Sequence, residues 1–462
     1  MLTYSMEERG DLPLYEYLYR RIRADILDGT LSADEKLPSK RRLAEHLQVS
    51  VITVEGAYQQ LEAEGYLYTL PKRGFFVSPI QRLSAPKEQP IPPQLPEEQP
   101  HWRLDLRSNQ VDTGSFPVST WARLTRQVLS ESGEALLRPV PHQGLPALRQ
   151  AIADDLRDYK GMSVSPAQII IGAGAEYLYL LLAQLLGSTA VFAVEDPGYS
   201  KIRQVYQTCG AACHPVSLDA QGLDIAALRR SGATVAHISP SHHYPTGLVT
   251  PIGRRQELLH WAEETDGFII EDDYDSEFRF TGRPIPTLQS IDRHGRVIYM
   301  NTFSQTISPS MRVGFMVLPL RLLERYRKEL DFYACTVPAL EQHVLSRFLS
   351  RGYYEQHLSR MRKEYRLRRA RVLDAFRSSP FAHRISISEQ GAGLHFLLRL
   401  ETEHSDETLK QRAAERGVRL SFLSEYAAVP NDAFTHTLVV NYAGLDADRL
   451  AEAITLLGEI FA

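Results

Sequence analysis

Cysteine, long apolar runs and surplus positive charge are all scarce in this sequence of 462 residues. The three cysteines, Cys209, Cys213 and Cys335, are an odd number without CxxC spacing. This spacing argues against a disulfide framework and against a zinc site. We therefore expect free thiols, no bound metal and a reducing, cytoplasmic environment.

No apolar run reaches the roughly 18 residues that a membrane-spanning helix needs. The first residues, MLTYSMEERGDLP, lack the basic start and apolar core of a signal peptide. The sequence therefore predicts no membrane partner. Because the net charge is −4, any binding of nucleic acid has to depend on a local basic surface rather than on bulk charge.

Proline divides the chain into two zones. Residues 79–104 include PIPPQLPEEQP, where repeated prolines remove backbone donors and favour extended geometry. We expect a linker here, an N-terminal domain over residues 1–78 and a second domain over 105–462. In the second zone, runs such as QIIIGAG, TAVFAVED and GFIIEDD alternate with helical patterns, which is typical of a parallel sheet with crossover helices.

The N-terminal zone has the pattern of a winged helix-turn-helix. Apolar residues recur every fourth position from Leu14 to Ile26, and Pro38 with Ser39 marks a second helix start. The segment VITVEGAYQQLEAEGYL predicts a third helix, ending at Gly65. The stretch YLYTLPKRGFFVSP then alternates as a β-hairpin with a basic tip, which would form the wing.

This arrangement favours DNA binding, with the start of the third helix in a major groove and basic residues on phosphates. Helix-turn-helix units also serve protein contacts, and the acidic residues of this zone weaken a purely electrostatic case. Tyr58 is expected to pack inward. The residues predicted to contact DNA are Ser39, Lys40, Arg41, Thr53, Lys72 and Arg73.

The segments PLYEYLYRRIRADILDGTL, EKLPSKRRLAEHLQVSVITVEGAYQQLEAEGYL and KRGFFV together resemble the winged helix-turn-helix of the GntR family. The resemblance implies a reader of double-stranded DNA. Val51 and Ile52 depart from the family pattern, because many members carry an arginine and an asparagine there. The base preference is therefore not readable from these positions.

Short motifs in the second zone point to a site for a phosphorylated ring compound. The amides around Gly174 and Ala175 in IIIGAGAEYLY stand at a helix start, where they can hold an anion. In EDPGYSK, Tyr199 offers a ring for stacking. EDDYDSEF places Asp272 and Tyr274 at a strand end, where α/β proteins bind ligands.

The stretch VIYMNTFSQTISPSMR adds hydroxyls at Thr302 and Ser304 and the guanidinium of Arg312, all suited to a phosphate. In order and spacing, these motifs resemble the pyridoxal 5′-phosphate site of the fold-type I aminotransferases. The resemblance implies a large, mixed, mostly parallel sheet domain with a small C-terminal α+β subdomain from about residue 335.

Residue by residue, the resemblance implies that Asp272 pairs with the pyridine nitrogen and Tyr274 with the ring oxygen, while Tyr199 stacks on the ring. Tyr244 lies in the SPSHHYPTG loop that would face the ring, and its neighbours His242 and His243 are interpreted as structural. The implied cofactor-binding residues are Gly174, Ala175, Tyr199, Tyr244, Asp272, Tyr274, Thr302, Ser304, Gln305 and Arg312.

Gln305 stands where the family carries its Schiff-base lysine. An amide nitrogen is not nucleophilic, so we expect non-covalent cofactor binding and no catalytic residue. Lys201 is interpreted as an exposed salt-bridge residue rather than a substitute for the missing lysine. Val439 stands where many relatives carry an arginine for a substrate carboxylate, so the clamp for an amino acid is expected to be missing.

A GntR-type reader joined to an aminotransferase-like domain resembles the MocR subfamily of transcriptional regulators. The resemblance implies a homodimer, domain-swapped, that senses pyridoxal 5′-phosphate or a related amine or amino-acid effector and is not an enzyme. Two alternatives stay open at this point. One is an aminotransferase with a DNA-binding appendage, inactivated at Gln305, and the other is a cofactor-free regulator.

Overall fold

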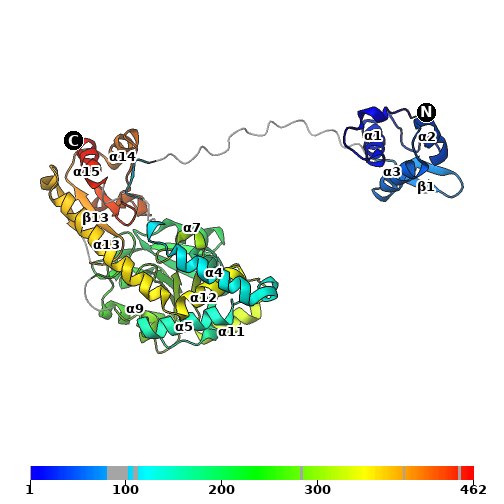
Figure 1. The fold of residues 1–462 in the computed structure, drawn as a ribbon. Coiled ribbons are helices and arrows are strands. Elements are labelled where there is room, and N and C mark those ends of the chain that lie inside the picture. Colours follow the sequence, from blue (N-terminus) through cyan, green and yellow to red (C-terminus); the bar gives the residue numbers. More distant parts are fainter. Residues whose placement is uncertain (1, 81–101, 108–112, 281–284, 389–390, 446–448) are drawn as a thin grey trace. The chain divides into compact units, whose positions relative to one another are not determined.

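The computed structural model describes residues 2–80, 102–107, 113–280, 285–388, 391–445 and 449–462. The chain forms two compact units, Met1–Gln99 and Pro100–Ala462 (Figure 1). Most of the predicted linker, residues 81–101, lies outside the described residues. Its last predicted residue, Leu104, already belongs to a strand of the second unit, β3 (Leu104–Asp105).

The first unit has three helices followed by a hairpin (Figure 1): α1 (Leu14–Asp28), α2 (Lys40–Leu47), α3 (Val51–Ala63), β1 (Leu67–Leu70) and β2 (Gly74–Val77). Gly29 ends α1 at a φ of 90°, a left-handed conformation that glycine adopts without strain. The side chains of Ser39 and Ser50 accept backbone bonds from Arg42 and Thr53 and so cap α2 and α3. Helix α3 ends at Ala63, slightly before the predicted Gly65.

A large sheet forms the centre of the second unit, in the strand order β4-β11-β10-β9-β8-β5-β6-β7. The strands are β4 (Ile169–Gly172), β5 (Val191–Asp196), β6 (Ala212–Asp219), β7 (Gly222–Leu223), β8 (Val235–Ile238), β9 (Phe268–Asp272), β10 (Val297–Thr302) and β11 (Gly314–Val317). Pairs from β10 to β6 are parallel, whereas β11 runs antiparallel to both neighbours. The predicted mixed, mostly parallel sheet is confirmed.

Successive side chains of a strand point to opposite faces of this sheet, and helices cover both faces. Ile169 and Ile171 pack with α4 (Val118–Ser132), α5 (Pro146–Lys160) and α12 (Ala339–Ser350). Ile170 packs on the opposite face with α6 (Ala175–Leu186), α7 (Ser200–Thr208) and α11 (Leu320–Glu329). Two more helices, α8 (Ile225–Arg230) and α9 (Ile252–Glu264), cover the β6 side. The short α10 (Leu288–Ile291) follows β9.

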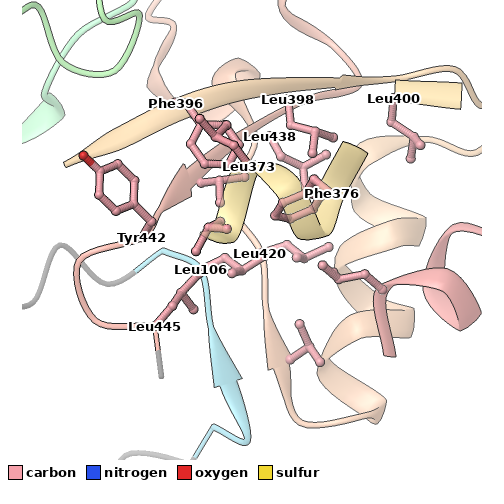
Figure 2. Packing of buried hydrophobic residues seen from close by; sticks show 14 of the residues in the cluster. Leu106, Leu373, Phe376, Phe396, Leu398, Leu400, Leu420, Leu438, Tyr442 and Leu445 are labelled. Carbon is pink, nitrogen blue, oxygen red and sulfur yellow. The ribbon is translucent and has the colours of Figure 1, made fainter. Parts of the chain in front are cut away.

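A smaller subdomain has its own apolar core, shown in Figure 2. Its antiparallel sheet contains β12 (Ile385–Ser388), β13 (His395–Leu400) and β15 (Thr437–Asn441). Three helices pack with it: α13 (Tyr353–Arg377), α14 (Asp406–Glu415) and α15 (Leu450–Phe461). Apart from Leu106 and Phe278, the buried residues of this core begin at Met361 within α13, whereas the subdomain was predicted to start at about residue 335; α12 packs with the large sheet.

A further small sheet joins the beginning of the second unit to its end. β3 pairs in parallel with β14 (Val418–Arg419), and Leu106, next along the chain, lies in the small-subdomain core (Figure 2). In the part of the chain that the structure describes, no helix is long and apolar enough to cross a membrane.

We predict that Leu398→Ala destabilises the small subdomain. Leu398 is fully buried, and truncating a buried leucine costs about 2–5 kcal/mol. Leu367→Ala on α13 is the matched control, because that side chain is about half exposed. Thermal unfolding should show a lower Tm for the Leu398 variant only, and equal Tm values would contradict the assigned core.

Candidate functional site

A cavity of about 520 Å³ lies at the carboxyl ends of β5, β8, β9 and β10, next to the starts of α6 and α7. This is the position where parallel α/β sheets bind ligands. Nine of the ten predicted cofactor-binding residues line this cavity. Those that precede β9 in the chain are Ala175, Tyr199 and Tyr244. Those from β9 onward are Asp272, Tyr274, Thr302, Ser304, Gln305 and Arg312.

Gly174 does not line the cavity but shapes one end of it. It precedes α6 at a φ of 88°, and a Cβ there would lie 2.4 Å from Nη2 of Arg312. Arg312 itself sits in the left-handed region, with a φ of 50°. The absence of a side chain at residue 174 therefore lets the guanidinium lie against the start of α6, where helix amides and a cation together suit a phosphate.

Arg312 already has an acidic partner within the protein. Its Nη2 atom lies 2.5 Å from Oε2 of Glu176, and Nζ of Lys201 lies 3.6 Å from the other carboxylate oxygen. Burial acts to raise the pKa of Glu176, but hydrogen bonds from Arg312 and the backbone, with the charges of Arg312 and Lys201, together outweigh it and hold the pKa below its ordinary value. Lys201 thus forms the predicted salt bridge while also lining the cavity.

Asp272 also lines the cavity, buried at the last position of β9. Its Oδ2 atom accepts a hydrogen bond of 2.5 Å from the Tyr179 hydroxyl and lies 3.4 Å from Nε2 of His237. The Tyr206 hydroxyl is 2.7 Å from the other ring nitrogen of His237. These contacts fix the carboxylate so that it can face a ring nitrogen in the cavity.

Tyrosine side chains form the wall beside Asp272. The hydroxyls of Tyr244 and Tyr426 are 2.9 Å apart, and the Tyr199 ring meets the Tyr244 ring edge-on at a centroid distance of 6.2 Å. Burial raises the pKa of Tyr244 and Tyr274 well above the ordinary value, so both hydroxyls stay protonated. They can therefore donate hydrogen bonds to a ligand oxygen.

The two histidines of the SPSHHYPTG loop differ in their surroundings. Nδ1 of His242 lies 2.9 Å from Asp275, and His242 borders a neighbouring cavity rather than this one. His243 lines this cavity, bonds to Thr246 at 2.7 Å and has its Nε2 atom 3.5 Å from Glu195. Burial lowers the pKa of His243 to about 3, so its ring is neutral.

Glu195 is a buried acid that the sequence did not single out. It accepts a bond of 2.9 Å from the Ser239 amide, and burial, with the nearby charge of Asp272, raises its pKa to about 8. At neutral pH the carboxyl is therefore mostly protonated. Glu195 and His243 add no net charge to the cavity.

Val439 is fully buried in β15, and its amide donates to the Ser421 carbonyl at 2.9 Å. It is absent from the cavity lining. Two arginines that the sequence did not single out, Arg107 and Arg419, do line the cavity. No sequence motif identifies them, because they are far apart in the chain and β3 and β14 bring them together.

The residues predicted to contact DNA lie in three local structures of the first unit. Arg41 is exposed near the start of α2, and Lys72 and Arg73 lie exposed in the turn between β1 and β2. Lys40 is less available than expected, because its Nζ atom lies 2.5 Å from Glu55. Tyr58 packs inward as predicted, and its hydroxyl donates to the Pro38 carbonyl at 3.1 Å.

Both units match known protein families. Residues 14–77 match the model of the bacterial regulatory proteins of the gntR family. Residues 103–457 match the model of the class I and II aminotransferases. The chain belongs to the GntR-type regulators with an aminotransferase domain.

Relatives of this regulator family align over nearly the whole chain. The uncharacterized HTH-type transcriptional regulator YdeL of Bacillus subtilis is 36% identical over 99% of this chain and 98% of its own. The probable rhizopine catabolism regulatory protein MocR of Rhizobium meliloti is 33% identical, with 99% and 95% covered. Their names support a DNA-binding regulator.

A solved aminotransferase shares the fold of the second unit. LysN of Thermus thermophilus, an α-aminoadipate aminotransferase complexed with N-(5′-phosphopyridoxyl)-L-leucine, is 26% identical with a TM-score of 0.67. The match covers 78% of this chain and 92% of LysN. The predicted fold-type I architecture is therefore confirmed.

We predict that Glu195→Gln flattens the pH dependence of stability. The folded pKa of about 8 lies above the ordinary value of 4.5, so the folded protein keeps a proton that the unfolded chain loses. Wild-type stability should therefore fall as pH rises from about 5 to 8, by on the order of 3 kcal/mol from this group. Calorimetric Tm values across this range measure the loss.

Glu329→Gln is the control for this test, because Glu329 lies exposed on α11. It should keep the wild-type pH profile, whereas the Glu195 variant should lose less stability toward pH 8. Identical profiles for all three proteins would show that Glu195 is ionised in the fold.

Proposed function

We propose that this chain is a DNA-binding transcriptional regulator whose aminotransferase-like domain binds pyridoxal 5′-phosphate, or a related amine or amino-acid compound, without a covalent bond. The observation that carries the proposal is the cavity in which Asp272, Tyr274, Arg312 and Gln305 meet. The family of the second unit supports pyridoxal phosphate as the class of cofactor.

The donor set fits this compound group by group. The start of α6 and Arg312 suit the phosphate. The guanidinium of Arg312 occupies the space that a side chain at residue 174 would need. Asp272 suits a protonated pyridine nitrogen, and its bonds from Tyr179 keep the carboxylate in place. Tyr274 and Tyr244 offer hydroxyl donors for the ring oxygen.

Gln305 supports a sensor rather than an enzyme. Position 305 follows β10 and lines the cavity, where a lysine would be able to reach the ligand. An amide cannot attack an aldehyde or carry a proton between carbons at neutral pH. The residues that suit a ligand are thus present, Gln305 cannot react with it, and Lys201, which also lines the cavity, is paired with Glu176.

We also propose that the regulator is a homodimer. Val118 and Leu129 on α4 and Leu137 just beyond it are at least half exposed, although all three are large apolar side chains. A second copy covering this face would remove them from water. Two copies would present two reader units to two DNA half-sites.

Restoring a lysine tests the ligand site. Gln305→Lys should give a new visible absorption band when pyridoxal 5′-phosphate is added, because an amine placed at this position condenses with the aldehyde. The wild-type protein should instead show only a raised Tm with the cofactor. Gln221→Lys, in an exposed turn, controls for reaction with surface lysines.

A Gln305→Lys variant that gives no more signal than the Gln221 control would show that residue 305 does not face the cofactor. A wild-type Tm that stays constant at millimolar cofactor would favour the cofactor-free regulator.

Removing positive charge from the first unit tests whether this unit binds DNA. The double variant Arg41→Gln with Lys72→Gln should weaken binding to a duplex obtained by in-vitro selection. If each residue contacts one phosphate, the slope of log K against log salt should become shallower by about 0.9 per residue. Electrophoretic shifts at several salt concentrations give this slope.

The double variant Arg9→Gln with Arg20→Gln is the control, because neither residue is predicted to contact DNA. An unchanged affinity and salt slope for the Arg41 and Lys72 variant would reject the assigned DNA face.

A further inference from the structure

Arg107 and Arg419 lie on one face of the ribbon that β3 and β14 form. Arg419 pairs in register with Asp105, so their side chains leave the ribbon on the same side. Arg107 follows the end of β3 by two residues, and the structure places it in the lining of the same cavity as Arg419. Both arginines line the cavity that holds Asp272 and Arg312.

Packing on the other face of the ribbon fixes this orientation. Leu106, Val418 and Leu420 alternate with these polar residues and are buried in the small-subdomain core. Figure 2 shows Leu106 and Leu420 among its apolar side chains. Turning the ribbon over would expose these apolar side chains to water, so their burial opposes the reverse orientation.

Hydrogen bonds also hold the backbone beside the two arginines. The Leu106 amide donates to the Arg419 carbonyl at 3.0 Å, and the Asn441 side chain donates to the Arg107 carbonyl at 3.1 Å. Asn441 is 1% exposed and lies two positions after Val439 in β15. Strand β15, which has Val439 where many relatives carry an arginine, thus positions the backbone of a different arginine, Arg107.

The positive charge at this end of the cavity exceeds its nearby negative charge. Nη1 of Arg419 lies 3.5 Å from Asp105, a loose ion pair, and its guanidinium lies 5.9 Å from the Trp102 ring. Three acids line the cavity: Glu176 is paired with Arg312, Asp272 accepts a bond from Tyr179, and burial keeps Glu195 mostly protonated, with a pKa of about 8. Two guanidinium groups facing one cavity favour an anionic group between them.

We propose that Arg107 and Arg419 form a carboxylate subsite, and that the ligand of the cavity is a phosphopyridoxyl conjugate of an amino acid. This inference rests on the proposed function, because the phosphate and ring of the conjugate occupy the residues assigned above. The conjugate's carboxylate lies at the ribbon, so its recognition does not require an arginine at residue 439. Without a reactive lysine, the protein binds the conjugate intact.

Two probes that differ in the carboxylate test this inference on the full-length protein. They are N-(5′-phosphopyridoxyl)-L-alanine, a stable secondary amine, and pyridoxamine 5′-phosphate, which lacks the amino-acid part. We expect wild-type protein to bind the alanine conjugate at least tenfold more tightly in calorimetric titrations. Arg419→Gln should remove this preference and leave the affinity for pyridoxamine 5′-phosphate within about twofold.

Arg416→Gln is the matched control. Arg416 is three residues away, has a similar side-chain exposure of 38% against 39% for Arg419, and does not line the cavity. This variant should keep the wild-type preference. Arg107→Gln should lower the preference as Arg419→Gln does, and a Tm equal to wild type without ligand shows that each variant is folded.

The outcomes separate this inference from the function on which it rests. Equal wild-type affinity for both probes, or a preference that survives Arg419→Gln, would overturn the carboxylate subsite while leaving the pyridoxyl-phosphate site intact. Failure of both probes to bind would overturn the proposed ligand site itself.

Discussion

The buried carboxylate of Asp272 is the constraint on which the ligand cavity depends. A charged group in such a position is costly unless hydrogen bonds compensate it. Tyr179 supplies a bond from α6, and His237 approaches from β8. These two elements are therefore held against the end of β9, and α6 also carries the amides that we propose for the phosphate. One buried carboxyl group thus connects two elements that line the cavity.

Asp273, the next residue, is also a buried carboxyl group that hydrogen bonds compensate. Its Oδ2 atom accepts bonds from Lys160 of α5 at 2.8 Å and from the Tyr299 hydroxyl of β10 at 2.7 Å. Coulombic attraction and a hydrogen bond from Lys160 outweigh burial and keep the pKa of Asp273 below its ordinary value. Asp272 and Asp273 therefore anchor helices on opposite faces of the sheet, α6 through Tyr179 and α5 through Lys160.

Much of this architecture was predictable from sequence because local patterns specify it. The serine that caps α2 is a local signal, and runs of β-branched and other apolar residues identified β4, β5 and β9. The strands β6 and β11 were missed, since HPV in β6 and the short GFMV of β11 have weak patterns. Tyr179 and His237 were missed because an apolar helix and an apolar strand conceal their hydrogen-bonding roles.

The ribbon of β3 and β14 lies near the beginning of the second unit. Within the described residues, β3 is the first strand after the first unit, and Arg107 stands two positions beyond its end. The residues that line the cavity therefore begin, in chain order, close to the N-terminal end of the second unit. A ligand bound by Arg107, as we propose, would contact the part of the second unit that is nearest in sequence to the helix-turn-helix unit.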